Sequence, residues 1–158
     1  MSMNYLRIIS AFMLLSAGLS GCMEETPSNI NPKLVEISDK GCVNDTKASS
    51  EKAYLYLDNE DGNLVVKLCG VGENCAFKYT GFTADVFADG NTISLYINHN
   101  YTISANCVCT VEEIKTTISG LENGSYDIVI YFNDWGSWKE SFRFSKSLHK
   151  KTSISKWL

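Results

Sequence analysis

The sequence predicts an all-β domain, built as an antiparallel β-sandwich of seven or eight strands. Two observations lead to this prediction. From residue 33 onward, apolar and polar residues alternate with a period of two, while helical periodicity is nearly absent. The alternating segments are also short, and turn signals such as Asp61-Gly62 and Asp89-Gly90 separate them. Short strands at this spacing are typical of two antiparallel sheets packed face to face.

The alternation places the strands one by one. In chain order, the predicted strands cover residues 33–38, 52–57, 63–69, 79–88, 91–98, 107–119, 126–132 and 138–144. In the strand 91–98, Ile93, Leu95 and Ile97 share one face, which predicts that this face points into the core. The segment 107–119 is unusually long, and Glu112-Glu113 shifts its apolar phase. This shift predicts a bulge or a switch of face at the two glutamates.

A turn motif narrows the fold further. Leu121, Gly124 and Tyr126 have the spacing Leu-x-x-Gly-x-Tyr. This pattern resembles the turn that enters a late strand of immunoglobulin-like and fibronectin-like modules, where the tyrosine hydroxyl caps the connection. The expected fold is therefore an immunoglobulin-like or fibronectin-like β-sandwich, and the motif says nothing about chemistry.

The N-terminal residues have the organisation of an export signal. Arg7 precedes a twelve-residue apolar stretch from Ile8 to Leu19, which is shorter than the roughly 20 residues of a transmembrane helix. The stretch ends in Leu19-Ser20-Gly21-Cys22, which resembles the lipobox of bacterial lipoproteins. The resemblance implies that residues 1–21 are a cleaved signal peptide and that Cys22 carries the lipid.

An acylated Cys22 would hold the chain on a bilayer, because each buried methylene contributes about 0.8 kcal/mol and two chains give stable anchoring. Residues 22–33 are polar, contain both prolines and are predicted to be a tether with a reach of roughly 20 Å. Glu24-Glu25 resembles the acidic signal that directs lipoproteins of Bacteroidota to the cell surface. We therefore expect a lipid-anchored protein of the outer membrane that faces the cell exterior, with the periplasmic face as the alternative.

Charge is distributed unevenly over the mature chain. Residues 22–138 hold seven Lys and Arg against seventeen Asp and Glu, whereas residues 139–158 hold six against one, Glu140. The acidic body argues against a nucleic-acid partner. The predicted domain spans residues 34–146, and residues 147–158 are predicted to be a basic C-terminal tail, with a solvated end of a terminal strand as the alternative.

Five cysteines follow Cys22, and export to an oxidising compartment favours disulfides. Cys107 and Cys109 are too far apart on one strand face to bond to each other, so each needs its own partner. Cys69 and Cys75 flank one loop and are the predicted partners, in either pairing, which leaves Cys42 as the odd thiol. The alternative is a zinc site formed by the same four cysteines, but their spacing is not that of a standard zinc site.

Several segments together resemble a known family. They are Asp61-Gly62-Asn63-Leu64-Val65-Val66, Asn74-Cys75, Asp89-Gly90-Asn91-Thr92-Ile93, Cys107-Val108-Cys109 and the turn that ends at Tyr126. They are similar to small cysteine-containing lipoproteins of gut Bacteroidota, over residues 61–132. The resemblance implies a compact β-sandwich with clustered cysteines and supplies no activity. Members often carry a Cys-Cys pair where this chain has Asn74-Cys75, so the pairing of that family is not transferred.

The inventory of chemical groups favours binding over catalysis. The sequence has no Gly-x-Ser-x-Gly elbow, no phosphate-binding loop and no dinucleotide fingerprint, so we predict no enzyme activity, cofactor or metal. The candidate ligand-binding residues lie in two loops and are Tyr101, Asn133, Asp134, Trp135 and Trp138. Indole faces stack on sugar rings and amides bind hydroxyls, so a surface glycan is a candidate ligand of the predicted binding module, whose ligand the sequence does not identify. The alternatives are core packing of Trp138 and an accessory role, in which the domain docks an envelope protein.

Overall fold

The computed structural model describes residues 30–43, 52–100, 106–133 and 136–156. These residues form twelve strands and one 3₁₀ helix, η2 (Cys75–Tyr79). The strands are β1 (Lys33–Asp39), β2 (Cys42–Val43), β3 (Lys52–Glu60), β4 (Asn63–Cys69), β5 (Gly72–Asn74), β6 (Phe82–Asp89), β7 (Thr92–His99), β8 (Val108–Val111), β9 (Ile114–Ser119), β10 (Gly124–Phe132), β11 (Gly136–Phe144) and β12 (His149–Ser155). The all-β prediction is confirmed, while the expected number of seven or eight strands is too low.

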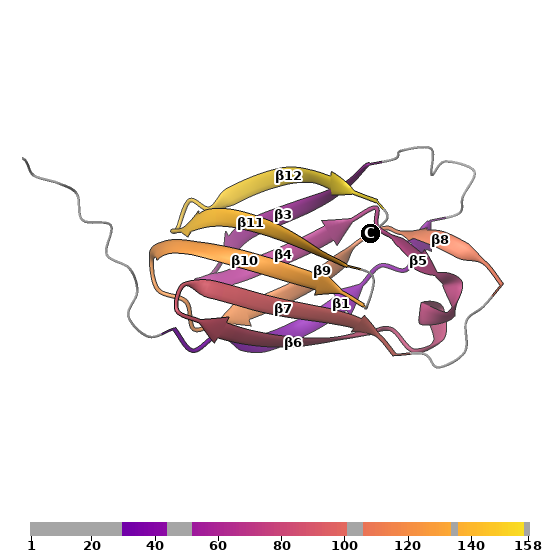
Figure 1. Cartoon of the computed structure of the whole chain (residues 1–158), viewed down its shortest axis with the longest axis horizontal. Helices are drawn as coiled ribbons and strands as arrows, with labels where there is room; N and C mark the ends of the chain where they lie inside the picture. The colour runs from indigo at the N-terminus through magenta and orange to yellow at the C-terminus, as the bar shows by residue number, and fades with distance from the viewer. Residues whose placement is uncertain (1–29, 44–51, 101–105, 134–135, 157–158) are drawn as a thin grey trace, which may run out of the picture.

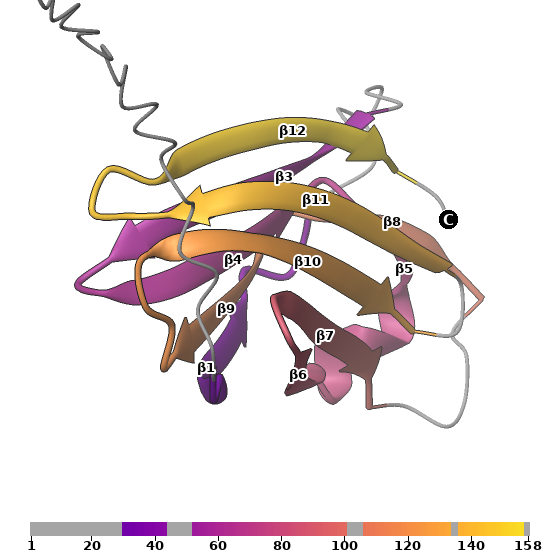
Figure 2. The ribbon, with the colours of Figure 1, turned by 60° about the vertical axis from the view of Figure 1, so that its left-hand side comes forward.

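The strands form three sheets, with the orders β1-β9-β4-β3-β12, β11-β10-β7-β6 and β2-β8-β5. Figure 1 shows the two large sheets along the body of the molecule, and the small sheet with η2 at one end of the long axis. Figure 2 separates the two large sheets into layers, with β10 and β11 in front of β3 and β4. Among the described residues, no helix is long and apolar enough to span a membrane.

The predicted antiparallel arrangement holds for all the described strand pairs except one. β7 and β10 are parallel, with Leu95 opposite Ile130 and Tyr96 opposite Tyr131. Two parallel neighbours need a crossover connection. The chain supplies it by leaving β7 for β8 and β9, which belong to the other two sheets, before it returns as β10. The alternation of residues is the same in parallel and antiparallel strands, so the sequence could not reveal this pair.

The long predicted strand 107–119 is divided at the two glutamates. Val108–Val111 joins the small sheet and Ile114–Ser119 joins the first large sheet, so the chain changes sheets at Glu112-Glu113. The predicted strand 79–88 begins later, at Phe82, because Cys75–Tyr79 forms η2. The side chain of Asn74 caps η2 by accepting a hydrogen bond from the Ala76 N–H at 3.0 Å.

The predicted C-terminal boundary needs correction. Residues 149–155 are a strand, β12, which pairs with β3 from His149 opposite Asp58 to Ser155 opposite Lys52. The basic residues of this segment stay near the sheet surface, where the ammonium group of Lys151 lies 4.0 Å from the centre of the Tyr54 ring. The segment 147–158 therefore belongs to the domain as far as it is described, and the tail is not separate from it.

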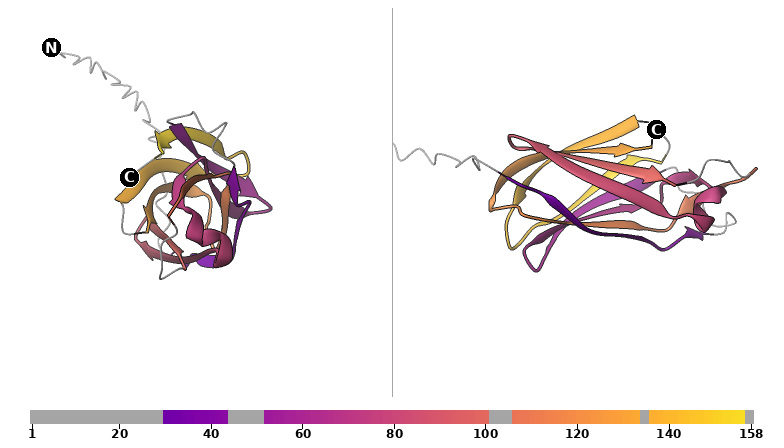
Figure 3. Two further views of the ribbon diagram at one scale, coloured as in Figure 1. Left: turned by 90° about the vertical axis from the view of Figure 1, so that its right-hand side faces the viewer. Right: turned by 90° about the horizontal axis from the view of Figure 1, so that it is seen from below.

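The core lies between the two large sheets. Leu55, Leu57, Ile93, Leu95 and Ile128 have at most 1% exposure and come from both layers. At the sheet edges, β1 contacts β6, and the Lys150 ammonium group of β12 donates to the Ser141 carbonyl of β11 at 2.6 Å. Seen down the long axis in Figure 3, the strands surround this core.

The chain enters the domain beside the turn between β9 and β10. Gly120 in that turn has a φ of +85°, and a Cβ atom there would lie 2.4 Å from the Asn31 carbonyl oxygen. Only glycine fits both the left-handed backbone and this close approach. The start of β1 is thereby fixed at the end of the domain where β10 begins.

The hydroxyl of Tyr126 donates to the carbonyl of Glu122 at 2.9 Å, as expected for a tyrosine corner. Replacing Tyr126 by phenylalanine removes this hydrogen bond and leaves a half-buried carbonyl without it. We expect the free energy of unfolding to fall by about 1 kcal/mol, measured by urea denaturation. Tyr131→Phe, whose hydroxyl caps no turn, is the control, and an equal loss in both variants would contradict this role for Tyr126.

Candidate functional site

The structure removes Trp138 from the predicted binding loop. Trp138 is the third residue of β11 and is only 9% exposed, because its position in the strand points inward. Its ring packs against Phe132, with 5.8 Å between ring centres. Trp138 is thus a core residue, and the alternative interpretation holds. Tyr101, Asp134 and Trp135 lie outside the described residues.

Asn133 directly follows β10 and connects two parts of the domain. Its φ of +49° is in the left-handed region, which asparagine tolerates better than most residues. The side-chain Oδ1 accepts from the backbone N–H of His99 at 2.7 Å, and Nδ2 donates to Oε2 of Glu73 at 2.8 Å. The amide therefore holds the end of β7 and the small strand β5 beside the end of β10.

Next to Asn133, three aromatic side chains cross the outer face of the second large sheet. Tyr131 of β10 and Tyr96 of β7 are register partners, and their rings stack with centres 4.5 Å apart and planes 9° apart. Phe87 of β6 meets Tyr96 edge to face, with 5.9 Å between ring centres. We call these three residues the aromatic row.

Two of the three rings in the aromatic row are exposed to solvent, and Tyr131 is half-buried. Phe87 is 60% exposed and Tyr96 is 37% exposed, which makes them two of the most exposed large apolar residues among those described. Cross-strand contacts between such rings stabilise a sheet modestly, and exposed aromatic clusters also commonly mark binding surfaces. The described part of the chain thus contains exposed rings, at residues that the sequence analysis did not name.

A depression of about 360 Å³ begins at the row and continues to the end of the sheet. It is lined by Tyr96, Asn98, Tyr131, Asn133, Gly136 and Ser137. Two phenol rings, two amides and a hydroxyl therefore surround one open space, and none of these lining groups carries a charge at neutral pH. Such a surface offers apolar faces for stacking together with donors and acceptors for hydroxyl groups.

An ion pair lies farther along the same face. The ammonium group of Lys139 lies 2.7 Å from Oδ2 of Asp127, and the Ser141 hydroxyl donates to Oδ1 at 2.5 Å. These two contacts hold the pKa of Asp127 below its usual value. Asp127 lies four residues before Tyr131 on β10. The exposed Asp85 of β6 is the register partner of Tyr96 on the same face, so one carboxylate borders the row. The lining of the depression itself is uncharged.

A second depression, of about 320 Å³, lies on the outer face of the other large sheet. It is lined by Tyr56, Asp58, Lys67, Cys69, Glu113 and His149. Its charged groups are engaged with one another: Lys67 contacts Asp58 at 3.3 Å, and Nδ1 of His149 lies 2.6 Å from Oδ1 of Asp58. Burial of the Lys67 ammonium group lowers its pKa, but the hydrogen bonds that it donates to Glu60 and Asp58 outweigh this effect, so the pKa lies above its usual value. Because these groups saturate one another, the face offers less to a ligand than the aromatic row.

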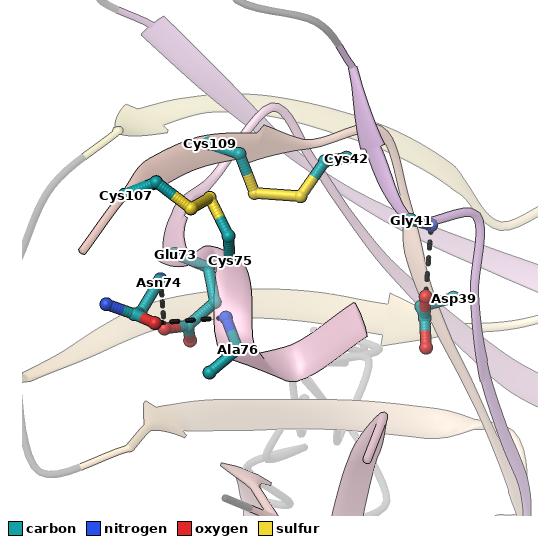
Figure 4. The surroundings of a disulfide bond; sticks show 9 residues. All are labelled: Asp39, Gly41, Cys42, Glu73, Asn74, Cys75, Ala76, Cys107 and Cys109. Atoms are coloured by element: carbon teal, nitrogen blue, oxygen red, sulfur yellow. Dashed lines mark hydrogen bonds between the residues drawn. A yellow bond between two sulfur atoms is a disulfide. The ribbon is translucent and has the colours of Figure 1, made fainter. Parts of the chain in front are cut away.

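The small sheet carries two disulfides, which confirms that this chain forms such bonds. Cys42 is joined to Cys109 and Cys75 to Cys107, with Cα–Cα distances of 5.8 and 5.6 Å. Figure 4 shows both bridges side by side, with Glu73 close to Cys75, which follows it by two residues. Cys107 and Cys109 thus have separate partners, as predicted.

The prediction that Cys69 is bridged and Cys42 is free is wrong: Cys69 is a free thiol, and Cys42 is bonded to Cys109. Cys42 lies in the two-residue strand β2, which pairs with β8 opposite Val111. A strand this short gives no periodic signal, so the sequence offered no reason to bring Cys42 beside Cys109. Within the described part of the chain, no three His, Cys, Asp or Glu side chains are placed to hold a metal ion.

Burial is the main reason that the pKa of the Cys69 thiol lies above its usual value, and the nearby Glu113 raises it further. Little thiolate is therefore present at pH 7, and we expect iodoacetamide to label Cys69 more slowly than an unfolded cysteine peptide. The rate should rise about tenfold per pH unit as the thiol titrates. Peptide mass spectrometry of a chain with Cys22→Ala checks this, and labelling of Cys42 instead would contradict the disulfides described here.

In comparisons with known proteins, no protein-family model, no curated protein and no solved structure matches this chain. The sequence did contain one signal for the aromatic row. Phe87, Tyr96 and Tyr131 occupy outward positions of alternating strands, where polar residues are the rule, and this departure from alternation marks them.

Proposed function

We propose that this protein is a lipoprotein that binds glycans at the outer cell surface, anchored in the outer membrane through an acylated Cys22. The observation that supports binding is the exposed aromatic row beside a depression lined by amides and a hydroxyl. The lipobox-like residues before Cys22 support the anchor. The proposed role is binding without catalysis, in line with the lack of nucleophile motifs in the sequence.

The chemistry of the site suits a sugar ring. The C–H groups of a pyranose form an apolar face that packs on phenol and phenyl rings, as other apolar groups do. Its hydroxyls project from the rim of the ring, where Asn98, Asn133 and Ser137 can exchange hydrogen bonds with them. An uncharged lining favours neutral sugars, since recognition of carboxylate or sulfate groups commonly relies on Arg or Lys.

The position of the site also suits a tethered protein. Lys33 at the start of β1 pairs with Ser119, close to where β10 begins, whereas Asn133 follows the last residue of β10. Nine residues of strand at about 3.3 Å each separate these two ends by roughly 30 Å. A tether that enters at Lys33 would place the aromatic depression at the end of the domain farther from the membrane.

For the fold, we propose an immunoglobulin-like or fibronectin-like sandwich. The hydrogen bond from Tyr126 to Glu122 and the two facing sheets support this assignment. The parallel β7–β10 pair is a departure from the all-antiparallel sheets of those modules. A variant of the sandwich with an additional crossover accounts for both features.

A glycan array tests the binding role most directly. The chain from residue 22 onward, with Cys22→Ala, is applied to arrays of neutral, uronic-acid and sulfated oligosaccharides. We expect binding to neutral glycans. Binding to none would remove the carbohydrate hypothesis and leave docking of an envelope protein, for which the exposed Phe87 is the favouring observation. Mass spectrometry of protein from its native cell tests the anchor, which fails if the Cys22 thiol is unmodified.

A further inference from the structure

Glu73 has no solvent exposure although it carries a carboxyl group. Burial of such a group is unfavourable unless hydrogen bonds replace the lost water. Oε1 of Glu73 accepts from the Asn74 N–H at 2.6 Å, and Oε2 accepts from Nδ2 of Asn133 at 2.8 Å. Nδ1 of His99 lies 3.8 Å from Oε2. The ends of β5, β7 and β10 thus meet at one buried carboxyl group.

The second contact connects Glu73 to the aromatic depression, because Asn133 lines it. The Asn133 amide is held at both ends: Nδ2 donates to Glu73, and Oδ1 accepts from the His99 N–H at 2.7 Å. If the amide flipped, its oxygen would face the Glu73 carboxylate and its NH₂ group would face the His99 N–H, so both hydrogen bonds would be replaced by repulsive contacts. Glu73 therefore fixes the orientation of the amide.

An amide group has two N–H donors and two acceptor positions on its oxygen. The contact with Glu73 uses one N–H donor of Asn133, and the contact with the His99 N–H uses one acceptor position of Oδ1. The Asn133 side chain makes no other hydrogen bond within the described part of the chain. One donor and one acceptor remain. A pair of adjacent sugar hydroxyls can accept from the first and donate to the second, while the sugar ring packs on Tyr131.

We infer that Glu73 is a positioning residue for ligand binding, which acts by orienting the Asn133 amide toward adjacent hydroxyls of a neutral sugar. This inference rests on the proposed glycan-binding function and assigns a role to the one fully buried acidic side chain among the described residues. The neighbouring disulfide between Cys75 and Cys107 fixes the end of β5 from which Glu73 projects.

The test compares Glu73→Gln with Asn133→Gly, their double variant and the exposed control Glu36→Gln. Glutamine keeps the shape of Glu73, but its NH₂ group must face the Asn74 N–H or Nδ2 of Asn133, both of which now donate to the carboxylate. Glycine removes the Asn133 amide and tolerates the left-handed φ of 49°. Binding of cellohexaose, laminarihexaose and mannohexaose is measured by calorimetry, and side-chain amide signals of Asn133 are followed by NMR without sugar.

We expect Glu73→Gln to weaken binding of the bound hexasaccharide at least tenfold and to shift the Asn133 amide signals. The double variant should bind no more weakly than Asn133→Gly, because Glu73 acts through Asn133. The inference would be overturned if Glu73→Gln left the Asn133 amide signals or the affinity unchanged, or if the losses of affinity in the double variant were additive. The proposed function would still be tested separately by Tyr131→Ala. If the unmodified chain binds neither these sugars nor any neutral glycan on the array, both are overturned.

Discussion

Replacing Tyr131 by alanine is expected to weaken glycan binding about 30-fold, equivalent to about 2 kcal/mol. The Tyr131 ring stacks on Tyr96 with 4.5 Å between centres and lines the depression next to Asn133. Its loss removes a rigid apolar surface for the sugar and leaves Tyr96 without its stacking partner. Calorimetry with the tightest ligand from the glycan array measures the change.

The control for this prediction lies on the opposite sheet. Tyr54 is also partly buried on an outer face, where it contacts Tyr56 and the ammonium group of Lys151. Tyr54→Ala should therefore leave affinity unchanged, and Tyr131→Phe should retain most of it because the ring remains. Equal losses in Tyr54→Ala and Tyr131→Ala would place the binding surface elsewhere or indicate a general effect on folding.

Replacing both Cys42 and Cys109 by alanine is expected to lower the free energy of unfolding by about 4 kcal/mol. This bridge closes a loop with a sequence separation of 67 residues, and the open loop gives the unfolded chain more conformational freedom. β2 has only two residues and pairs with β8 through them, so the bridge is its main attachment. Urea denaturation of the oxidised proteins measures the difference.

Cys69→Ala is the matched control, since Cys69 is a free thiol on the outer face of β4. Its replacement removes no cross-link and should change the free energy of unfolding by less than about 1 kcal/mol. If Cys69→Ala destabilised the protein as much as the loss of Cys42 and Cys109, Cys69 would be bonded in solution and the connectivity described here would be wrong.

Strand positions could be predicted well wherever turn glycines bounded an alternating segment. The strand Asn63–Cys69 was predicted with the bounds it has, because Gly62 and Gly70 adopt positive φ values on either side of it. β12 was not predicted, since its only apolar side chain against the core is Ile154 and its lysines resemble a solvated tail. Its stability as a strand comes from pairing with β3, a contact distant in sequence.

The candidate site was predicted only in part. Asn133 lies in the loop that was expected to bind, but the aromatic row comes from three strands. Tyr131 follows Tyr96 by 35 residues and Phe87 by 44 residues. Their alignment depends on the parallel β7–β10 register, which no local pattern encodes. Trp138 failed as a site residue because its side-chain direction depends on where β11 begins, and that lies in an adjacent turn.

The sequence by itself determined the strand class, most strand positions, the tyrosine corner and the formation of disulfides, because each depends on neighbouring residues or on the composition of the chain. Tertiary structure alone decided the sheet order, the parallel pair, the partner of Cys42 and the burial of Glu73 beneath Asn133. These features depend on contacts between distant segments. Such contacts form only when several segments pack around one core, so no local pattern of residues encodes them.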